Sequence, residues 1–179
     1  MSSKRQIDNI ALIGFMGTGK STVGRLLAEQ LRFSFLDTDE LIESRAGKTI
    51  SAIFASEGEA AFRQHEKDVV AELSSRNRVI ISTGGGLGAS EANIASLKEH
   101  ALVVCLWASP EKIWERVRHQ SHRPLLQDPD PLAKIRQLLA SREKSYKQAD
   151  ALLNTEVRSL KEVAHQVLHQ FHLARSGSR

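Results

Sequence analysis

The chain has 179 residues, which suffices for one domain around one sizeable core. An apolar fraction of 41% and a charged fraction of 26% are ordinary for a soluble globular protein, and no stretch reaches the roughly 18 apolar residues of a membrane helix. The net charge of +4 comes from dispersed basic residues without interleaved aromatic rings, so we expect neither a membrane nor a nucleic-acid partner.

A single cysteine, Cys105, excludes an internal disulfide and favours a reducing compartment. The first residues, MSSKRQIDN, show no apolar signal-peptide region, so we expect a cytoplasmic protein. We expect residues 1–179 to form one domain, with an ordered body over about 7–173 and loose tails. No large exposed apolar stripe is evident, which favours a monomer.

Apolar strands alternate with amphipathic helices along the chain. The predicted strands are Ile10–Ile13, Ser34–Leu36, Val79–Ser82, Leu102–Trp107 and Ala151–Leu153. Helix starts are predicted at Ser109-Pro110 and Asp130-Pro131 and at the capping-box pairs Ser56/Glu59 and Ser159/Glu162. This alternation predicts an α/β fold, with a parallel sheet covered by helices on both faces and ligands beyond the carboxyl ends of the strands.

The segment GFMGTGKST, residues 14–22, follows the first predicted strand. It matches the phosphate-binding pattern G-x-x-x-x-G-K-S, whose glycines let backbone N–H groups turn towards phosphate oxygens at a helix start. Lys20 can reach the β- and γ-phosphates, while the Ser21 hydroxyl can bind Mg²⁺. The segment therefore predicts a nucleotide site with its Mg²⁺.

Two carboxylates, Asp37 and Asp39, follow the second predicted strand. Residues two apart on an extended chain point the same way, so both are expected to face the cleft. One can support the water shell of Mg²⁺ while the other holds or deprotonates a substrate hydroxyl. An N-cap role for Asp39 is the competing interpretation.

Further polar features follow the next strands. Arg63 and Glu66 are three apart on one predicted helical face, so Glu66 is expected to hold the guanidinium. The run Gly84–Gly86 would let a small substrate approach the main chain closely. Past the fourth strand, Arg116, Arg118 and Arg123 belong to a predicted mobile lid over about residues 116–130. Arg142 lies on the helix that follows.

Taken in order, these motifs resemble those of the shikimate kinases. The resemblance covers about residues 9–171 and rests on the phosphate loop, Asp-Thr-Asp, Phe-Arg-x-x-Glu, Gly-Gly-Gly, Arg-Pro-Leu-Leu and Arg-x-x-x-Tyr. It implies the three-layer P-loop kinase fold, with five parallel strands in the order 2-3-1-4-5 and a mobile lid. It also implies ATP- and Mg²⁺-dependent phosphorylation of the 3-hydroxyl of shikimate, in aromatic amino acid biosynthesis.

The resemblance also implies residue roles. The residues implied to bind shikimate are Asp39, Phe54, Phe62, Arg63, Gly84, Gly85, Gly86 and Arg142. Those implied to bind ATP are Gly17, Thr18, Gly19, Lys20, Ser21, Thr22, Arg116, Arg123 and Arg158. Lys20, Asp39 and Arg123 are implied to be catalytic, with Asp39 as the base, and Ser21 and, through water, Asp37 are implied to hold Mg²⁺.

Two other functions remain open on the sequence. A gluconate-type sugar-acid kinase would share the phosphate loop, the fold and an anionic polyol substrate, although Gly84–Gly86 together with Arg63 and Arg142 favours shikimate. A nucleotide-dependent nucleic-acid-binding or regulatory module is suggested only by the basic pI of about 9.4. It would bind oligonucleotides with a strong salt dependence.

Overall fold

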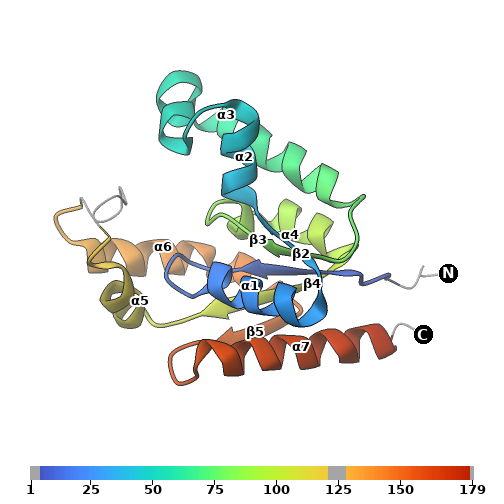
Figure 1. Ribbon diagram of the computed structural model, residues 1–179. Helices are drawn as coiled ribbons and strands as arrows, with labels where there is room; N and C mark the ends of the chain where they lie inside the picture. The colour runs from blue at the N-terminus through green and yellow to red at the C-terminus, as the bar shows by residue number, and fades with distance from the viewer. Residues whose placement is uncertain (1–4, 121–127, 178–179) are drawn as a thin grey trace.

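The computed structural model describes residues 5–120 and 128–177 of the chain, and Figure 1 shows its architecture. Five strands form one parallel sheet in the order β2-β3-β1-β4-β5, as predicted. The strands are β1 (Asn9–Ile13), β2 (Ser34–Asp37), β3 (Val79–Ser82), β4 (Ala101–Trp107) and β5 (Ala151–Asn154). All five predicted strands are therefore present, with bounds within one residue of those expected.

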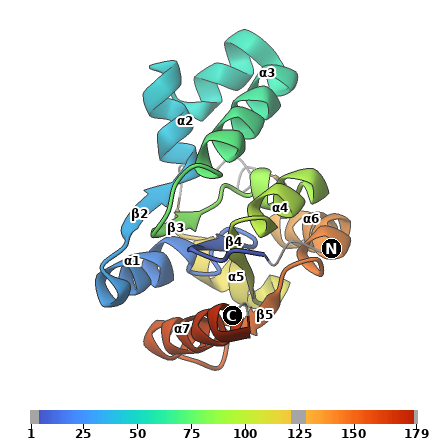
Figure 2. The ribbon, with the colours of Figure 1, turned by 90° about the vertical axis from the view of Figure 1, so that its right-hand side faces the viewer.

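Helices cover both faces of the sheet, as the two views in Figures 1 and 2 show. They are α1 (Lys20–Leu31), α2 (Thr38–Ala46), α3 (Ile50–Leu73), α4 (Glu91–Lys98), α5 (Pro110–Val117), α6 (Pro131–Tyr146) and α7 (Leu160–Gly177), with a short 3₁₀ turn η1 (Leu87–Ala89). Within the described ranges, no helix is both long and apolar enough to cross a bilayer.

The period of two along each central strand divides the core into two layers. On β1, Ile10 and Leu12 pack with α1 and α7, whereas Ala11 and Ile13 pack with α3 and α4. Cys105 on β4 belongs to the second layer and is fully buried, which fits the small hydrophobic residue expected in a strand covered on both faces.

Most predicted helix starts are confirmed. Ser109 and Asp130 each accept a backbone N–H of the helix that begins with the following proline, and Ser159 and Glu162 form the predicted reciprocal capping box.

The capping box predicted at Ser56 is wrong. Helix α3 begins at Ile50, where the Thr49 hydroxyl caps it by accepting the N–H of Ala52. The Ser56 hydroxyl instead donates to the carbonyl of Ala52, 2.8 Å away. Gly58 interrupts α3 with φ 84°, a conformation that favours glycine, so the helical segment that carries Arg63 starts after this kink.

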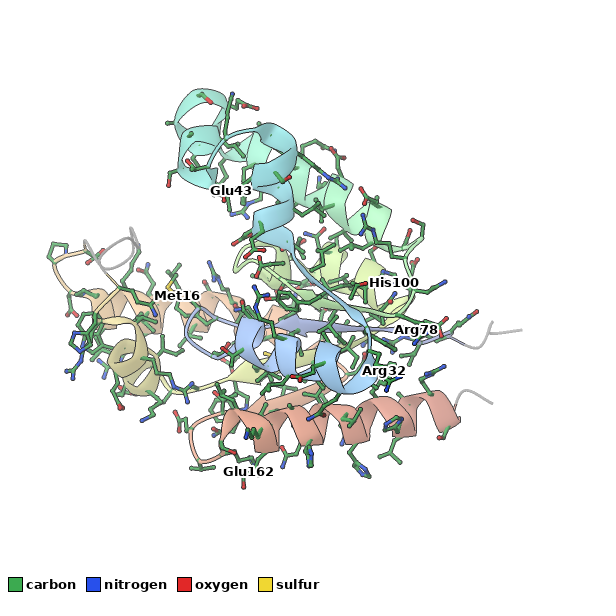
Figure 3. The ribbon with its side chains drawn as sticks, in the orientation of Figure 1. Met16, Arg32, Glu43, Arg78, His100 and Glu162 are labelled. Carbon is green, nitrogen blue, oxygen red and sulfur yellow. The ribbon has the colours of Figure 1, made fainter. Side chains whose placement is uncertain are left out.

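All strands end at the same edge of the sheet. In Figure 3, Met16, which follows β1, lies at this edge, while Arg78 and His100, which precede β3 and β4, lie at the opposite end. Helix α2 and the kinked start of α3 project beyond the carboxyl-end edge in Figure 1. Residues that follow β1 and β3 line a recess together with residues of α2 and α3.

Candidate active site

The glycines of the phosphate loop lie in close contact with neighbouring elements. Gly14 and Gly17 have φ of 134° and 76°, which other residues rarely adopt. A Cβ on Gly14 would lie 2.1 Å from the carbonyl oxygen of Leu106, and one on Gly17 would lie 2.7 Å from a methyl of Val117. Helix α1 starts at Lys20, so the N–H groups of its first turn are at the loop, as an anion site requires.

The side chains of the loop are tied to its own backbone and to the second strand. The Lys20 ammonium donates to the carbonyls of Gly14 (2.8 Å) and Phe15 (2.9 Å). The buried Thr18 hydroxyl also donates to the Phe15 carbonyl, so Thr18 closes the loop internally. The Ser21 hydroxyl donates to a carboxylate oxygen of Asp37, 3.3 Å away. This brings the two residues predicted to hold Mg²⁺ together.

Asp37 and Asp39 both line the recess, but not for the predicted reason. The chain is no longer extended between them, because α2 begins at Thr38. Asp37 caps this helix by accepting the N–H of Asp39 at 3.0 Å, so the N-cap role considered for Asp39 belongs to Asp37. The carboxylate of Asp39 therefore does not serve as a helix cap.

Asp39 has the electrostatics of a general base. Burial, together with the neighbouring carboxylates of Asp37 and Glu66, raises its pKa to about 6 against the opposing effect of Lys20. A carboxylate with a pKa close to neutrality matches the proton affinity that base catalysis needs near pH 7.

The run Gly84–Gly86 makes room for the three polar side chains predicted to bind the acceptor. None of these glycines has a positive φ, so space and not backbone conformation requires them. A Cβ on Gly84 would lie 2.0 Å from an Asp39 carboxylate oxygen, and one on Gly86 would lie 2.0 Å from an Arg63 nitrogen. A Cβ on Gly85 would approach an Arg142 nitrogen to 3.2 Å. The Thr38 hydroxyl holds the run by accepting the N–H of Gly84 at 2.9 Å.

Arg63 is fixed by two carboxylates. One of its nitrogens donates to Glu66 at 2.8 Å and another to Glu59 at 3.0 Å, which confirms the predicted Arg63–Glu66 pair. Glu66 is only 1% exposed; burial raises its pKa, and the hydrogen bond from Arg63 opposes that rise. The guanidinium therefore faces the recess in a defined orientation.

These side chains line one cavity of about 540 Å³. The predicted residues that it brings together are Gly17, Gly19, Lys20, Ser21, Thr22, Asp37, Asp39, Phe54, Phe62, Arg63, Gly84, Gly85, Gly86 and Arg142. Phe54 and Phe62 form an aromatic pair there, with ring centroids 4.7 Å apart. Met16, Ile50, Ser82 and Thr83 also line it and were not predicted, and so does Glu66, which was predicted only as the partner of Arg63. The polar Ser82-Thr83 pair at the end of a buried strand was the available signal for two of them.

The predicted adenine contacts do not line this cavity. The Arg116 guanidinium bonds the carbonyl of Gly17 at 3.1 Å and the hydroxyl and carbonyl of Thr155 at 2.9 and 2.5 Å. Arg158 is exposed and donates only to the carbonyl of Asn154, at 3.4 Å, within the described chain. The third predicted catalytic residue, Arg123, lies outside the described residues, as do residues 121–127 of the predicted lid as a whole.

Comparison with known proteins decides the family. The family model for shikimate kinase matches residues 16–172 of the chain. The shikimate kinase of Thermodesulfovibrio yellowstonii is 40% identical over 94% of this chain and 98% of its own length. The chain belongs to the shikimate kinase family. The structure of shikimate kinase from Acinetobacter baumannii in complex with shikimate superposes with a TM-score of 0.86 at 39% identity, over 94% of this chain and 95% of that one.

A gluconokinase structure from Sinorhizobium meliloti covers 97% of both chains with a TM-score of 0.64, but at 18% identity it shows the shared fold alone. As a member of the shikimate kinase family, the chain is an ATP-dependent kinase with the P-loop kinase fold. Membership of the shikimate kinase family disfavours both alternatives, the gluconate-type kinase and the nucleic-acid-binding module.

Proposed function

We propose that the chain transfers the γ-phosphoryl group of ATP to the 3-hydroxyl of shikimate, giving shikimate 3-phosphate and ADP, in aromatic amino acid biosynthesis. One observation carries the proposal: two guanidinium groups and one carboxylate of raised pKa meet along the Gly84–Gly86 wall, in the same cavity as the phosphate loop. Shikimate offers one carboxylate and three hydroxyls, and a guanidinium is the natural partner of a carboxylate.

In the proposed mechanism, Arg63 and Arg142 bind the carboxylate of shikimate while Phe54 and Phe62 pack against its ring. Asp39 orients the 3-hydroxyl and accepts its proton as the oxygen attacks the γ-phosphorus. Lys20, with Arg123 from the lid, stabilises the negative charge on the phosphoryl group in transfer. Phosphoryl transfer depends mainly on such positioning and charge stabilisation, so this small set of groups suffices.

The residues at the phosphate loop fit Mg²⁺. The Ser21 hydroxyl and the Asp37 carboxylate already lie within 3.3 Å of each other, and hydroxyl and carboxylate oxygens are the ligands that Mg²⁺ takes beside nucleotide phosphates. In our proposal Ser21 holds the ion directly and Asp37 holds it through water. A bound Mg²⁺ would neutralise part of the charge on the β- and γ-phosphates. We propose further that the enzyme is a cytoplasmic monomer of one domain.

The product tests the proposal. Purified chain, ATP, MgCl₂ and shikimate are incubated together, and the product is examined by phosphorus–proton correlation NMR. We expect one new phosphate ester, coupled to the proton on C3 of the ring, and no ester in a control without enzyme. A phosphate on another hydroxyl would overturn the assigned regiochemistry, and ATP hydrolysis without any ester would overturn the function.

The raised pKa of Asp39 predicts a pH limb in the activity. Because only the ionised carboxylate accepts a proton, kcat/KM for shikimate is expected to fall tenfold per pH unit below an apparent pKa of about 6. Above this pH the profile is flat until other groups titrate. Initial rates measured from about pH 5 to about pH 8.5 at constant ionic strength check this. A profile that stays flat down to pH 5 would contradict the role of Asp39.

The contacts of Arg116 predict that it acts on the position of the phosphate loop. Lysine cannot bond Gly17 and Thr155 simultaneously in the same fork, so Arg116→Lys is expected to weaken ATP binding roughly tenfold. Inorganic tripolyphosphate lacks the adenine ring, and its binding should weaken by the same factor in calorimetric titrations. Arg136→Lys, at an exposed Arg on α6, serves as the control. If the variant binds ATP more weakly but binds tripolyphosphate as tightly as the original chain, Arg116 contacts adenine instead.

A further inference from the structure

The two arginines of the acceptor site are oriented in different ways. Arg63 is held by Glu59 and Glu66, both within 3.0 Å. Arg142 has no carboxylate within ion-pair distance among the residues that the structure describes. The orientation of Arg142 therefore rests on contacts other than an ion pair, and Tyr146, one turn further along α6, interacts with it.

An aromatic ring of the phosphate loop lies against Arg142. The Cζ atom of Arg142 is 5.2 Å from the ring centroid of Phe15, within the range of a cation–π interaction. A ring face attracts a cation through its quadrupole without neutralising the charge. The ring thus contributes to orienting the guanidinium without using any of its N–H donors, and Tyr146 on α6 interacts with the guanidinium as well.

The ring of Phe15 is itself buried and closely packed. It is only 1% exposed and packs in a small core with Ala108, Ile113, Val117 and Ile135, where α5 and α6 meet. Phe15 does not line the cavity, so its ring supports Arg142 from behind. Gly85 also lies close to the guanidinium, because an added Cβ there would come within 3.2 Å of an Arg142 nitrogen.

We propose that Phe15 is a positioning residue for the acceptor, whose ring holds Arg142 in the orientation that binds the substrate carboxylate. The inference rests on the proposed function. It gives one residue two tasks, because the Phe15 carbonyl accepts hydrogen bonds from Lys20 and Thr18 within the phosphate loop while its ring faces the acceptor arginine. The nucleotide loop and the acceptor site are therefore in contact through this side chain.

Stepwise fluorination of the ring separates the cation–π interaction from packing. Phe15 is replaced site-specifically by mono-, di- and trifluorophenylalanine, which weakens the quadrupole at nearly constant shape. We expect log KM for shikimate to rise linearly along the series, reaching roughly threefold to tenfold at trifluorophenylalanine. KM for ATP and kcat should change less than about twofold, since the carbonyl contacts of Phe15 are retained.

Two controls keep the result interpretable. Phe171 is also fully buried with a cation, Arg175, 5.5 Å from its centroid, so its fluorination should leave KM for shikimate unchanged. In an Arg142→Gln background, where no cation faces the ring, fluorination of Phe15 should have a smaller effect on KM for shikimate.

A flat KM for shikimate along the Phe15 series, or an equal rise in KM for ATP, would overturn the proposal. Failure of the proposed function itself would show separately, because the unmodified chain would then not turn over shikimate.

Discussion

Replacing Asp39 by Asn is expected to lower kcat about 10²- to 10⁴-fold while ATP binding stays within about twofold of the original value. Asn keeps the size of the side chain and its contact with Gly84, but it cannot accept the proton of the attacking hydroxyl. The measurement is steady-state turnover with shikimate together with calorimetric binding of ATP. Glu40→Gln, the same loss of charge on the exposed side of α2, is the matched control and should retain full turnover.

The same variant should also be more stable than the original chain at pH 8. The pKa of Asp39 is raised from the ordinary Asp value of 3.8 to about 6 in the folded protein. Between these two values the folded protein binds more protons than the unfolded one, so its stability falls as pH rises through this range. Asn avoids this cost, so the free energy of unfolding should increase by about 1–3 kcal/mol at pH 8 and not at pH 4. Urea unfolding at the two pH values measures it. Wild-type turnover, or lower stability at pH 8, would refute the role given to Asp39.

Replacing Gly84 by Ala is the second change with a large expected effect. The new Cβ would lie 2.0, 2.7 and 2.9 Å from the three atoms of the Asp39 carboxyl group, so the base must move. A displacement of about 1 Å at a reacting group costs on the order of 10²-fold in rate, and we expect kcat to fall by at least that factor. ATP binding and the melting temperature should change little, because the nearest atoms that the new Cβ would meet belong to the Asp39 side chain and not to the phosphate loop.

Gly85→Ala is the matched control for this prediction. Its Cβ would meet only the flexible end of Arg142, at 3.2 Å, so a loss of kcat below about tenfold is expected. Equal effects of the two alanines on kcat would mean that the wall acts through backbone flexibility and not through the position of Asp39.

The sheet was predictable from the sequence mainly because its three central strands, β1, β3 and β4, are apolar and buried almost throughout. The predicted bounds differ by at most one residue, as for Leu102–Trp107 against the observed Ala101–Trp107. The capping box at Ser56 failed for a local reason: a Ser–Glu spacing carries no information about whether the helix has already begun. The kink in α3 lies at Gly58, but a glycine within a helical pattern does not by itself predict a positive φ.

For the site, sequence motifs identified the chemical groups but not how they are arranged. The pairing of Arg63 with Glu66 follows from helical periodicity and was predictable. The approach of Asp39 to Gly84 and of Arg142 to Phe15 joins segments that are far apart in the sequence, so no spacing rule could give them. Arg116 shows the same limit, since its distance from Thr155 depends on how α5 packs against the loop after β5.

The central claim is that the acceptor is chosen by residues far along the chain from the phosphate loop, and a comparison of kcat/KM for shikimate and gluconate tests it most directly. Both acids are polyols with one carboxylate, so the phosphate loop alone cannot distinguish them. ADP release is followed with each acid and without an acceptor, at saturating ATP and Mg²⁺. We expect kcat/KM for shikimate to exceed that for gluconate by a factor on the order of 10³ or more. Comparable values for the two acids, or ADP release that does not depend on shikimate, would contradict the account.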